Sequence, residues 1–89
     1  MDPGYDNAVY NLGVTYLKWG AYLNKKSDEE GKFSEEYKAK YQLALPYLER
    51  AVQMKDANAQ TWELLGRVYS VLGMQDDATN AFKKADELR

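Results

Sequence analysis

The sequence predicts an all-α fold of four helices, arranged as two antiparallel hairpins of which the first is extended. Three observations lead to this fold class. Apolar residues recur at steps of three and four, the period of an amphipathic helix. The pattern Leu-Gly-x-x-Tyr occurs both at residues 12–16 and at residues 65–69. Polar segments that contain glycine separate the periodic segments, as connections between helices do.

The first helix is expected over residues 6–24. One apolar face comprises Val9, Leu12, Tyr16 and Leu23. A second apolar face comprises Tyr10, Val14, Leu17 and Ala21. Because a helix that is apolar on two faces is covered on both, this helix is expected to lie between other elements or to have a partner.

A loop is expected over residues 24–32, which are polar throughout and include Gly31. Ser27 with Glu30 forms a candidate capping box for the next helix, and Ser34 is a competing N-cap. The acidic run 28–30 is interpreted as a solvated turn or helix start rather than as a cation site.

The second helix is expected from Phe33 to about Lys55, with Tyr37 and Tyr41 continuing the four-residue steps. Pro46 cannot donate its backbone hydrogen bond and is expected to kink the helix. One kinked helix is favoured over two, because the apolar stripe continues through Pro46 without a change of phase.

The third helix carries Trp62, Leu65 and Tyr69 on one face, with Gly66 in its middle. A glycine inside a helix costs roughly 1 kcal/mol relative to alanine, so a packing reason is expected. The prediction is that Gly66 gives room to the backbone of a crossing helix. Gly73 is expected to end the helix in the αL conformation.

The fourth helix is expected to begin with Asp76 as its N-cap. Its apolar residues, Ala78, Phe82, Ala85 and Leu88, follow at spacings of four, three and three. Small residues at the crossing point with large ones beside them predict two closely packed helices.

The order W-x2-L-G-x2-Y…A-x3-F, from Trp62 to Phe82, resembles the tetratricopeptide repeat, a 34-residue pair of antiparallel helices. The resemblance implies a right-handed superhelix of stacked hairpins. It places one repeat at about 59–89 and an earlier one at about 6–58, within a single domain over 1–89. The earlier repeat is longer than the standard 34 residues by an insertion near 21–43.

Two shorter motifs, Asn24-Lys25-Lys26 and the segment 44–49, resemble a bacterial subset of the family with a lengthened first hairpin. Asp2-Pro3 looks like the end of a preceding repeat, which predicts that the chain is part of a longer protein. The alternative is that these residues only form a turn and an N-cap.

Composition excludes several classes of function. The chain has no Cys and no His, so thiol chemistry and the commonest general base and metal ligand are absent. A net charge of −2 disfavours nucleic acid as a partner. No membrane insertion by this segment, no cofactor and no enzymatic activity are expected. The compartment stays open between bacterial cytoplasm and periplasm.

The resemblance implies a protein or peptide partner held in a concave groove that the first helix of each repeat lines. The first helix supplies Asn7, Tyr10, Asn11, Val14, Leu17 and Lys18. The third helix supplies Gln60, Glu63, Leu64, Arg67, Ser70 and Val71. Chaperone-docking relatives clamp a carboxylate with Lys and Asn, but Tyr10, Val14 and Leu64 hold those positions here. Aromatic and apolar contacts are therefore expected, with charge from Lys18 and Arg67.

Two functions follow as alternatives. A non-enzymatic interaction module is expected to expose a patch that contains Tyr10 and Leu17. A structural or self-association module would instead stack on further repeats or on another copy, because about three repeats are usually needed to bury a continuous core. For Val14, Leu17 and Val71, the alternative to binding is packing against a preceding repeat or against each other.

Overall fold

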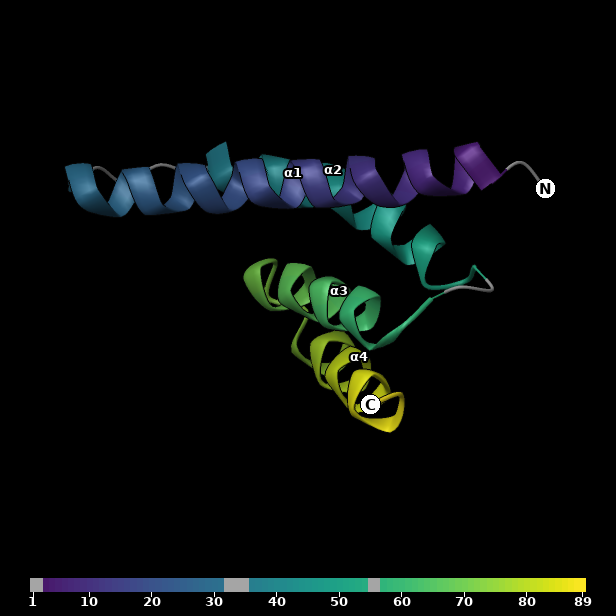
Figure 1. Cartoon of the computed structure of the whole chain (residues 1–89). Helices are drawn as coiled ribbons and strands as arrows, with labels where there is room; N and C mark the ends of the chain where they lie inside the picture. The colour runs from purple at the N-terminus through teal and green to yellow at the C-terminus, as the bar shows by residue number, and fades with distance from the viewer. Residues whose placement is uncertain (1–2, 32–35, 55–56) are drawn as a thin grey trace.

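The computed structural model describes residues 3–31, 36–54 and 57–89, and within these ranges it contains four helices and no strand. They are α1 (Pro3–Glu30), α2 (Glu36–Ala51), α3 (Ala59–Val71) and α4 (Gln75–Glu87). Figure 1 shows that α2 returns antiparallel to α1, and that α4 returns antiparallel to α3. The predicted all-α fold of helix hairpins is therefore confirmed.

Helix α1 extends further than predicted at both ends. The expected loop over 24–32 is wrong, because residues 24–30 continue the helix. This segment contains no Gly or Pro and is rich in Lys and Glu, which are strong helix formers. Gly31, with φ 66°, follows the last helical residue. Ser27 is consequently inside α1 and is not an N-cap, whereas Ser34 lies outside the described residues.

Helix α2 is one helix that contains Pro46, as expected, but it is shorter than the predicted segment. It ends at Ala51 instead of Lys55, and Phe33 and Lys55 lie outside the described residues. After Ala51 the backbone changes from i−4 to i−3 hydrogen bonds. The amide of Gln53 donates to the carbonyl of Arg50 at 3.1 Å, and that of Met54 to the carbonyl of Ala51 at 3.2 Å.

Of the caps predicted for α3 and α4, Gly73 is confirmed and Asp76 is wrong, and Asn58 is an N-cap that was not predicted. Asn58 caps α3, where its Oδ1 accepts from the Thr61 amide at 3.0 Å. Gly73 follows α3 with φ 79°, as predicted. Asp76 is not an N-cap, because α4 begins at Gln75 and Met74 is its N-cap. Asp76 lies in the first turn, where the helix dipole favours its carboxylate.

The hydrophobic core lies where α1, α2 and α3 meet. Its buried members are Leu17, Tyr41, Ala44, Leu48, Leu65 and Val68. Leu48 and Val68 are fully buried at 0% exposure, and Leu65 is 2% exposed. The core therefore joins the two hairpins, since α2 is common to the contacts within the first hairpin and to the contacts with α3.

The residues of the first apolar face predicted for α1 differ in exposure. Val9 is 4% exposed, whereas Leu12 is 42% exposed. The side that α1 turns toward α2 includes two glycines instead, Gly13 and Gly20, which are buried. The prediction that Leu12 belongs to a buried face is wrong, because α2 approaches α1 over the glycines.

Gly66 is a close-approach position, as predicted, but the group that occupies the space is a side chain. A Cβ at Gly66 would lie 2.8 Å from Cε1 of Phe82 on α4. A Cβ at Gly13 would lie 2.9 Å from Cδ2 of Leu48 on α2. In both hairpins a large apolar side chain of the second helix fills the space over a glycine of the first, so the predicted backbone crossing is corrected.

Candidate functional site

The predicted groove residues of α1 differ in exposure. Asn11 and Lys18 are exposed, and Tyr10 and Val14 are half-buried. Leu17 is only 7% exposed and belongs to the core cluster with residues of α2 and α3. The expectation that Leu17 is part of an exposed patch is therefore wrong. The structure does not describe the side chain of Asn7.

The predicted residues of α3 surround the contact between the two hairpins. Gln60 and Arg67 are exposed, and Ser70 is half-buried. Leu64 and Val71 are partly buried and pack against the core cluster. The packing of Leu64 and Val71 fits the alternative in which these side chains pack inside the protein and do not bind a partner. Gln60 and Arg67 remain accessible to a partner.

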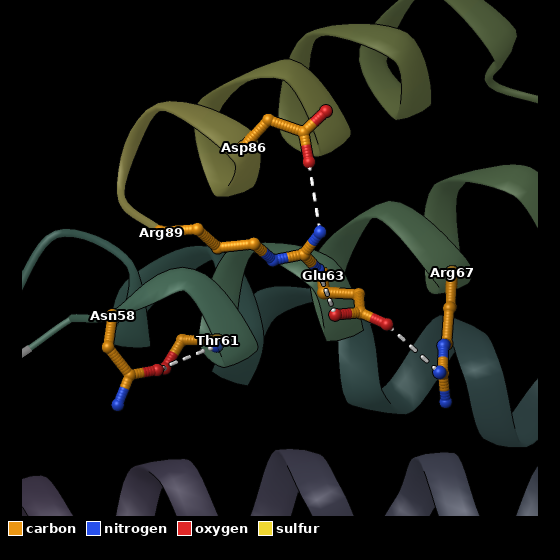
Figure 2. A network of polar contacts seen from close by, with 6 residues as sticks. All are labelled: Asn58, Thr61, Glu63, Arg67, Asp86 and Arg89. Atoms are coloured by element: carbon orange, nitrogen blue, oxygen red, sulfur yellow. Dashed lines mark hydrogen bonds and ion pairs between the residues drawn. The ribbon is translucent and has the colours of Figure 1, made fainter.

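Glu63 is the centre of a chain of ion pairs that Figure 2 shows between α3 and the end of α4. Its two carboxylate oxygens accept from Arg67 at 3.1 Å and from Arg89 at 2.6 Å. Arg89 also donates to Asp86 at 3.0 Å. These side chains are largely exposed, so the pairs orient Glu63 and Arg67 more than they stabilise the fold.

Arg67 also acts on Tyr41, a core residue of α2. Burial raises the pKa of the Tyr41 phenol, and the positive charge of Arg67 opposes that rise.

A polar contact between the hairpins was not anticipated from sequence. The hydroxyl of Tyr69 on α3 donates to Oε2 of Glu49 on α2 at 2.7 Å. Burial, and then the hydrogen bond to Glu49, raise the pKa of the Tyr69 phenol strongly. The contact joins α3 of the second hairpin to α2 of the first.

The profile of the tetratricopeptide repeat family matches residues 59–89. This range covers α3 and α4, the hairpin in which Gly66 packs on Phe82. The chain is a tetratricopeptide repeat protein. A relative in Pseudomonas aeruginosa, named Cytochrome c-type biogenesis protein CycH, is 38% identical over 77 residues. The match covers 86% of this chain and 18% of the relative, so the chain spans less than a fifth of that protein. No solved structure matches the chain.

The described part of this tetratricopeptide repeat protein shows no group of acidic, His or Cys side chains that could hold a metal ion. Among the described helices, none has the length and apolar character that a membrane span requires. The structure thus brings Leu17 into the core, packs Leu64 and Val71 against it, and leaves polar groove residues around half-buried Tyr10 and Val14. Binding by this set stays a prediction.

Sequence reasoning missed a set of large apolar residues that are exposed on the first hairpin. Leu12 is 42%, Trp19 48%, Tyr22 60% and Leu43 44% exposed. The amino group of Lys40 lies 3.8 Å from the ring centroid of Trp19. Tyr16 of α1 stacks on Tyr47 of α2, with ring centroids 6.0 Å apart. The signal that could have found this surface is the spacing of Leu12, Trp19 and Tyr22, which places them on one side of the helix.

Proposed function

We propose that this tetratricopeptide repeat protein is a non-enzymatic interaction module that holds a protein or peptide partner along α1 and α3. The observation that carries the proposal is the position of Tyr10. This aromatic side chain is only half-buried, and it lies one helix turn from half-buried Val14 on the side of α1 that also carries Leu17. Aromatic residues with one accessible face are the commonest anchors of protein interfaces.

Both helices also expose polar and charged side chains. Asn11 and Lys18 are exposed on α1, and Gln60 and Arg67 are exposed on α3. Leu17 of α1 and the buried residues Leu65 and Val68 of α3 belong to one core cluster, which α2 links. A partner segment along α1 and α3 would bury Tyr10 and Val14 while its polar atoms bond to the rim, which is the usual anatomy of an interface.

The process that we propose is cytochrome c-type biogenesis, because the matched relative in Pseudomonas aeruginosa is a protein of that process. Deletion of the gene from its host, followed by measurement of covalently bound haem in c-type cytochromes, tests this assignment. A loss of c-type haem that the intact gene restores is expected. Unchanged haem content would contradict the proposed role in cytochrome c-type biogenesis. It would not affect the proposed binding mode.

The binding mode is tested with peptides selected from a displayed random library against the purified chain. Tyr10→Ala is expected to weaken the selected peptides by about tenfold, equivalent to about 1.4 kcal/mol. Tyr22→Ala is the matched control, since Tyr22 is on the same helix, is 60% exposed and lies away from Tyr10. Equal losses in both variants, or no selected peptide, would contradict the proposal.

A further inference from the structure

The side of α1 that carries Tyr10 continues far along the helix. Five residues follow one another on it at spacings of four, four, three and four, which place side chains on one side of a helix. We call them the α1 row, and they are Tyr10, Val14, Lys18, Ala21 and Lys25. The first two are half-buried, and the last three are exposed. The row therefore begins with two apolar side chains and ends with a lysine.

The last part of the α1 row has no equivalent in the second hairpin. Gly73, which follows α3, corresponds to Gly20 inside α1, 53 positions earlier. Ala21 and Lys25 therefore have no counterpart in α3. Helix α1 has 28 residues and α3 has 13, and Figure 1 shows that α1 extends beyond α3. A segment that binds at Tyr10 can thus follow α1 past the end of α3.

The exposed part of the α1 row carries positive charge that the protein does not neutralise. Lys18 and Lys25 are exposed, and neither belongs to the ion pairs among the described residues. They are seven residues apart, about 10 Å along the helix. Residues 8–27 of α1 include no Asp or Glu. Both ammonium groups are therefore available to a partner.

Helix α3 does not offer the opposite charge. Glu63 is the acidic member of the predicted groove set, and its two carboxylate oxygens pair with Arg67 at 3.1 Å and with Arg89 at 2.6 Å. Arg89 also pairs with Asp86, so this group of four side chains is neutral as a whole. The lysines of the α1 row are consequently the uncompensated charges of the predicted groove.

The positive part of α1 ends at a defined place. Asp28 and Glu29 lie three and four residues after Lys25, and both are exposed. Neither forms an ion pair with Lys25 in the structure. An acidic segment that continued past Lys25 would meet these two like charges. The complementary segment is therefore expected to extend from Tyr10 to Lys25, which is about 22 Å of helix.

We propose that the partner held along α1 is an acidic protein segment. Its apolar residues contact Tyr10 and Val14, and its Asp or Glu side chains pair with Lys18 and Lys25. The proposal rests on the proposed function, because it names the chemistry of the segment that the groove holds. The chain has a net charge of −2, so the attraction comes from the local placement of the lysines and not from the overall charge.

The peptides selected from the displayed library are the first test. They are expected to be enriched in Asp and Glu on one side of their apolar residues. Lys25→Glu should weaken the tightest of them about fivefold at about 50 mM salt, and about twofold or less at about 500 mM, because salt screens exposed charges. Selected peptides without acidic enrichment, or a loss that does not depend on salt, would overturn the proposal.

Lys26→Glu is the matched control for Lys25→Glu. Both lysines are exposed on α1, and the two substitutions change the net charge equally. Lys26 is about 100° further around the helix and lies outside the α1 row. Its substitution should therefore change the affinity less than twofold. Equal losses in the two variants would mean that only the overall charge acts, and would overturn the pairing. Circular dichroism checks that each variant is folded.

A charge exchange identifies the contact itself. Each Asp or Glu of the tightest peptide is replaced by Lys in turn, and affinity is measured against the unchanged chain and against Lys25→Glu. At one position the altered peptide should bind Lys25→Glu more tightly than the unchanged chain, and Lys26→Glu should give no such reversal. Absence of any reversal would overturn the pairing with Lys25.

The outcome for the proposed function is separate. Binding that Tyr10→Ala weakens and Lys25→Glu does not would retain the groove and overturn the acidic partner. Binding that does not depend on Tyr10 would overturn both proposals. Losses in Tyr10→Ala and in Lys25→Glu, with Lys26→Glu unchanged, would support both.

Discussion

Two glycines at equivalent positions, Gly20 and Gly73, have different structural roles in the two hairpins. Gly73 follows α3 with φ 79°, and a Cβ there would meet no atom within 4 Å. Gly20, which lies 53 positions earlier, stays inside α1, and a Cβ there would lie 2.8 Å from the ring of Tyr41. The first hairpin therefore consists of helices of 28 and 16 residues, and the second of helices of 13 and 13.

The comparison teaches that a glycine does not by itself end a helix. In the second hairpin the chain must turn after Gly73, since α4 begins at Gln75. In the first hairpin α2 runs on beside α1, and Tyr41 occupies the space that the absent side chain leaves. The residues that a glycine meets in space decide between the two outcomes, and those residues are distant in sequence.

The largest effect is expected where the two hairpins share one side chain. Leu48 is 0% exposed, packs over Gly13 and belongs to the core cluster that includes α3. Leu48→Ala is expected to lower the free energy of unfolding by about 3 kcal/mol, from lost burial and the cavity that remains. Chemical denaturation measures this loss.

Leu43→Ala is the control for Leu48→Ala in the same helix. Leu43 is 44% exposed, so its truncation should cost less than about 1 kcal/mol. Similar losses at the two positions would mean that α2 is not the shared centre of both hairpins.

A smaller effect is expected from alanine at the equivalent glycines. Gly20→Ala should cost about 2 kcal/mol, because Tyr41 and the carbonyl oxygen of Tyr37, 3.1 Å from the new Cβ, leave no room. Gly73→Ala should cost about 1 kcal/mol, because an L residue is strained at positive φ.

Gly73→Asn separates the two causes by thermal denaturation. Asn tolerates the αL conformation, so it should be milder than Ala at residue 73. At residue 20, Gly20→Asn should destabilise the fold more than Gly20→Ala, because the larger side chain has no room. The same order of Ala and Asn at both sites would contradict the distinction between conformation and space.

An effect as small as that of Gly73→Ala is expected at the polar contact between the hairpins. Tyr69→Phe removes the bond to Glu49 and should cost about 1 kcal/mol near neutral pH. The pKa of the Tyr69 phenol is raised in the folded state, so its stabilisation is complete below the unfolded value of 10.0 and is lost as pH rises above it.

The pH dependence of unfolding between about pH 9 and 12 measures this contribution. The fall in stability above pH 10 should be shallower in Tyr69→Phe than in the unchanged chain. Glu49→Gln keeps an acceptor and removes the charge, so its profile should lie between the two. An unchanged profile in Tyr69→Phe would mean that the contact does not couple the hairpins.

The sequence predicted the fold class and the identity of α3 and α4, because Trp62, Gly66, Tyr69 and Phe82 form a local pattern with fixed spacing. It placed the end of α1 wrongly, because polar residues 24–30 are compatible with both loop and helix. The intrinsic preference of Lys and Glu for helix favours the helix in that segment.

The candidate site was predicted less completely than the fold. The helices that carry it were anticipated, but Leu17 was assigned to the groove, with packing as the alternative, and it belongs to the core. The exposure of Leu12 and Trp19 was also missed. A helix with apolar residues on several sides does not reveal which side its neighbours cover, since that depends on contacts between residues distant in the chain.

Each hairpin contains one tryptophan, and this gives the chain two intrinsic fluorophores in different surroundings. Trp19 of α1 is 48% exposed, whereas Trp62 of α3 packs against the core cluster. Water around an indole ring shifts its emission to longer wavelength, so the two residues emit differently. Replacing either one by Phe leaves a reporter for a single hairpin, with which its unfolding can be followed separately from that of the other.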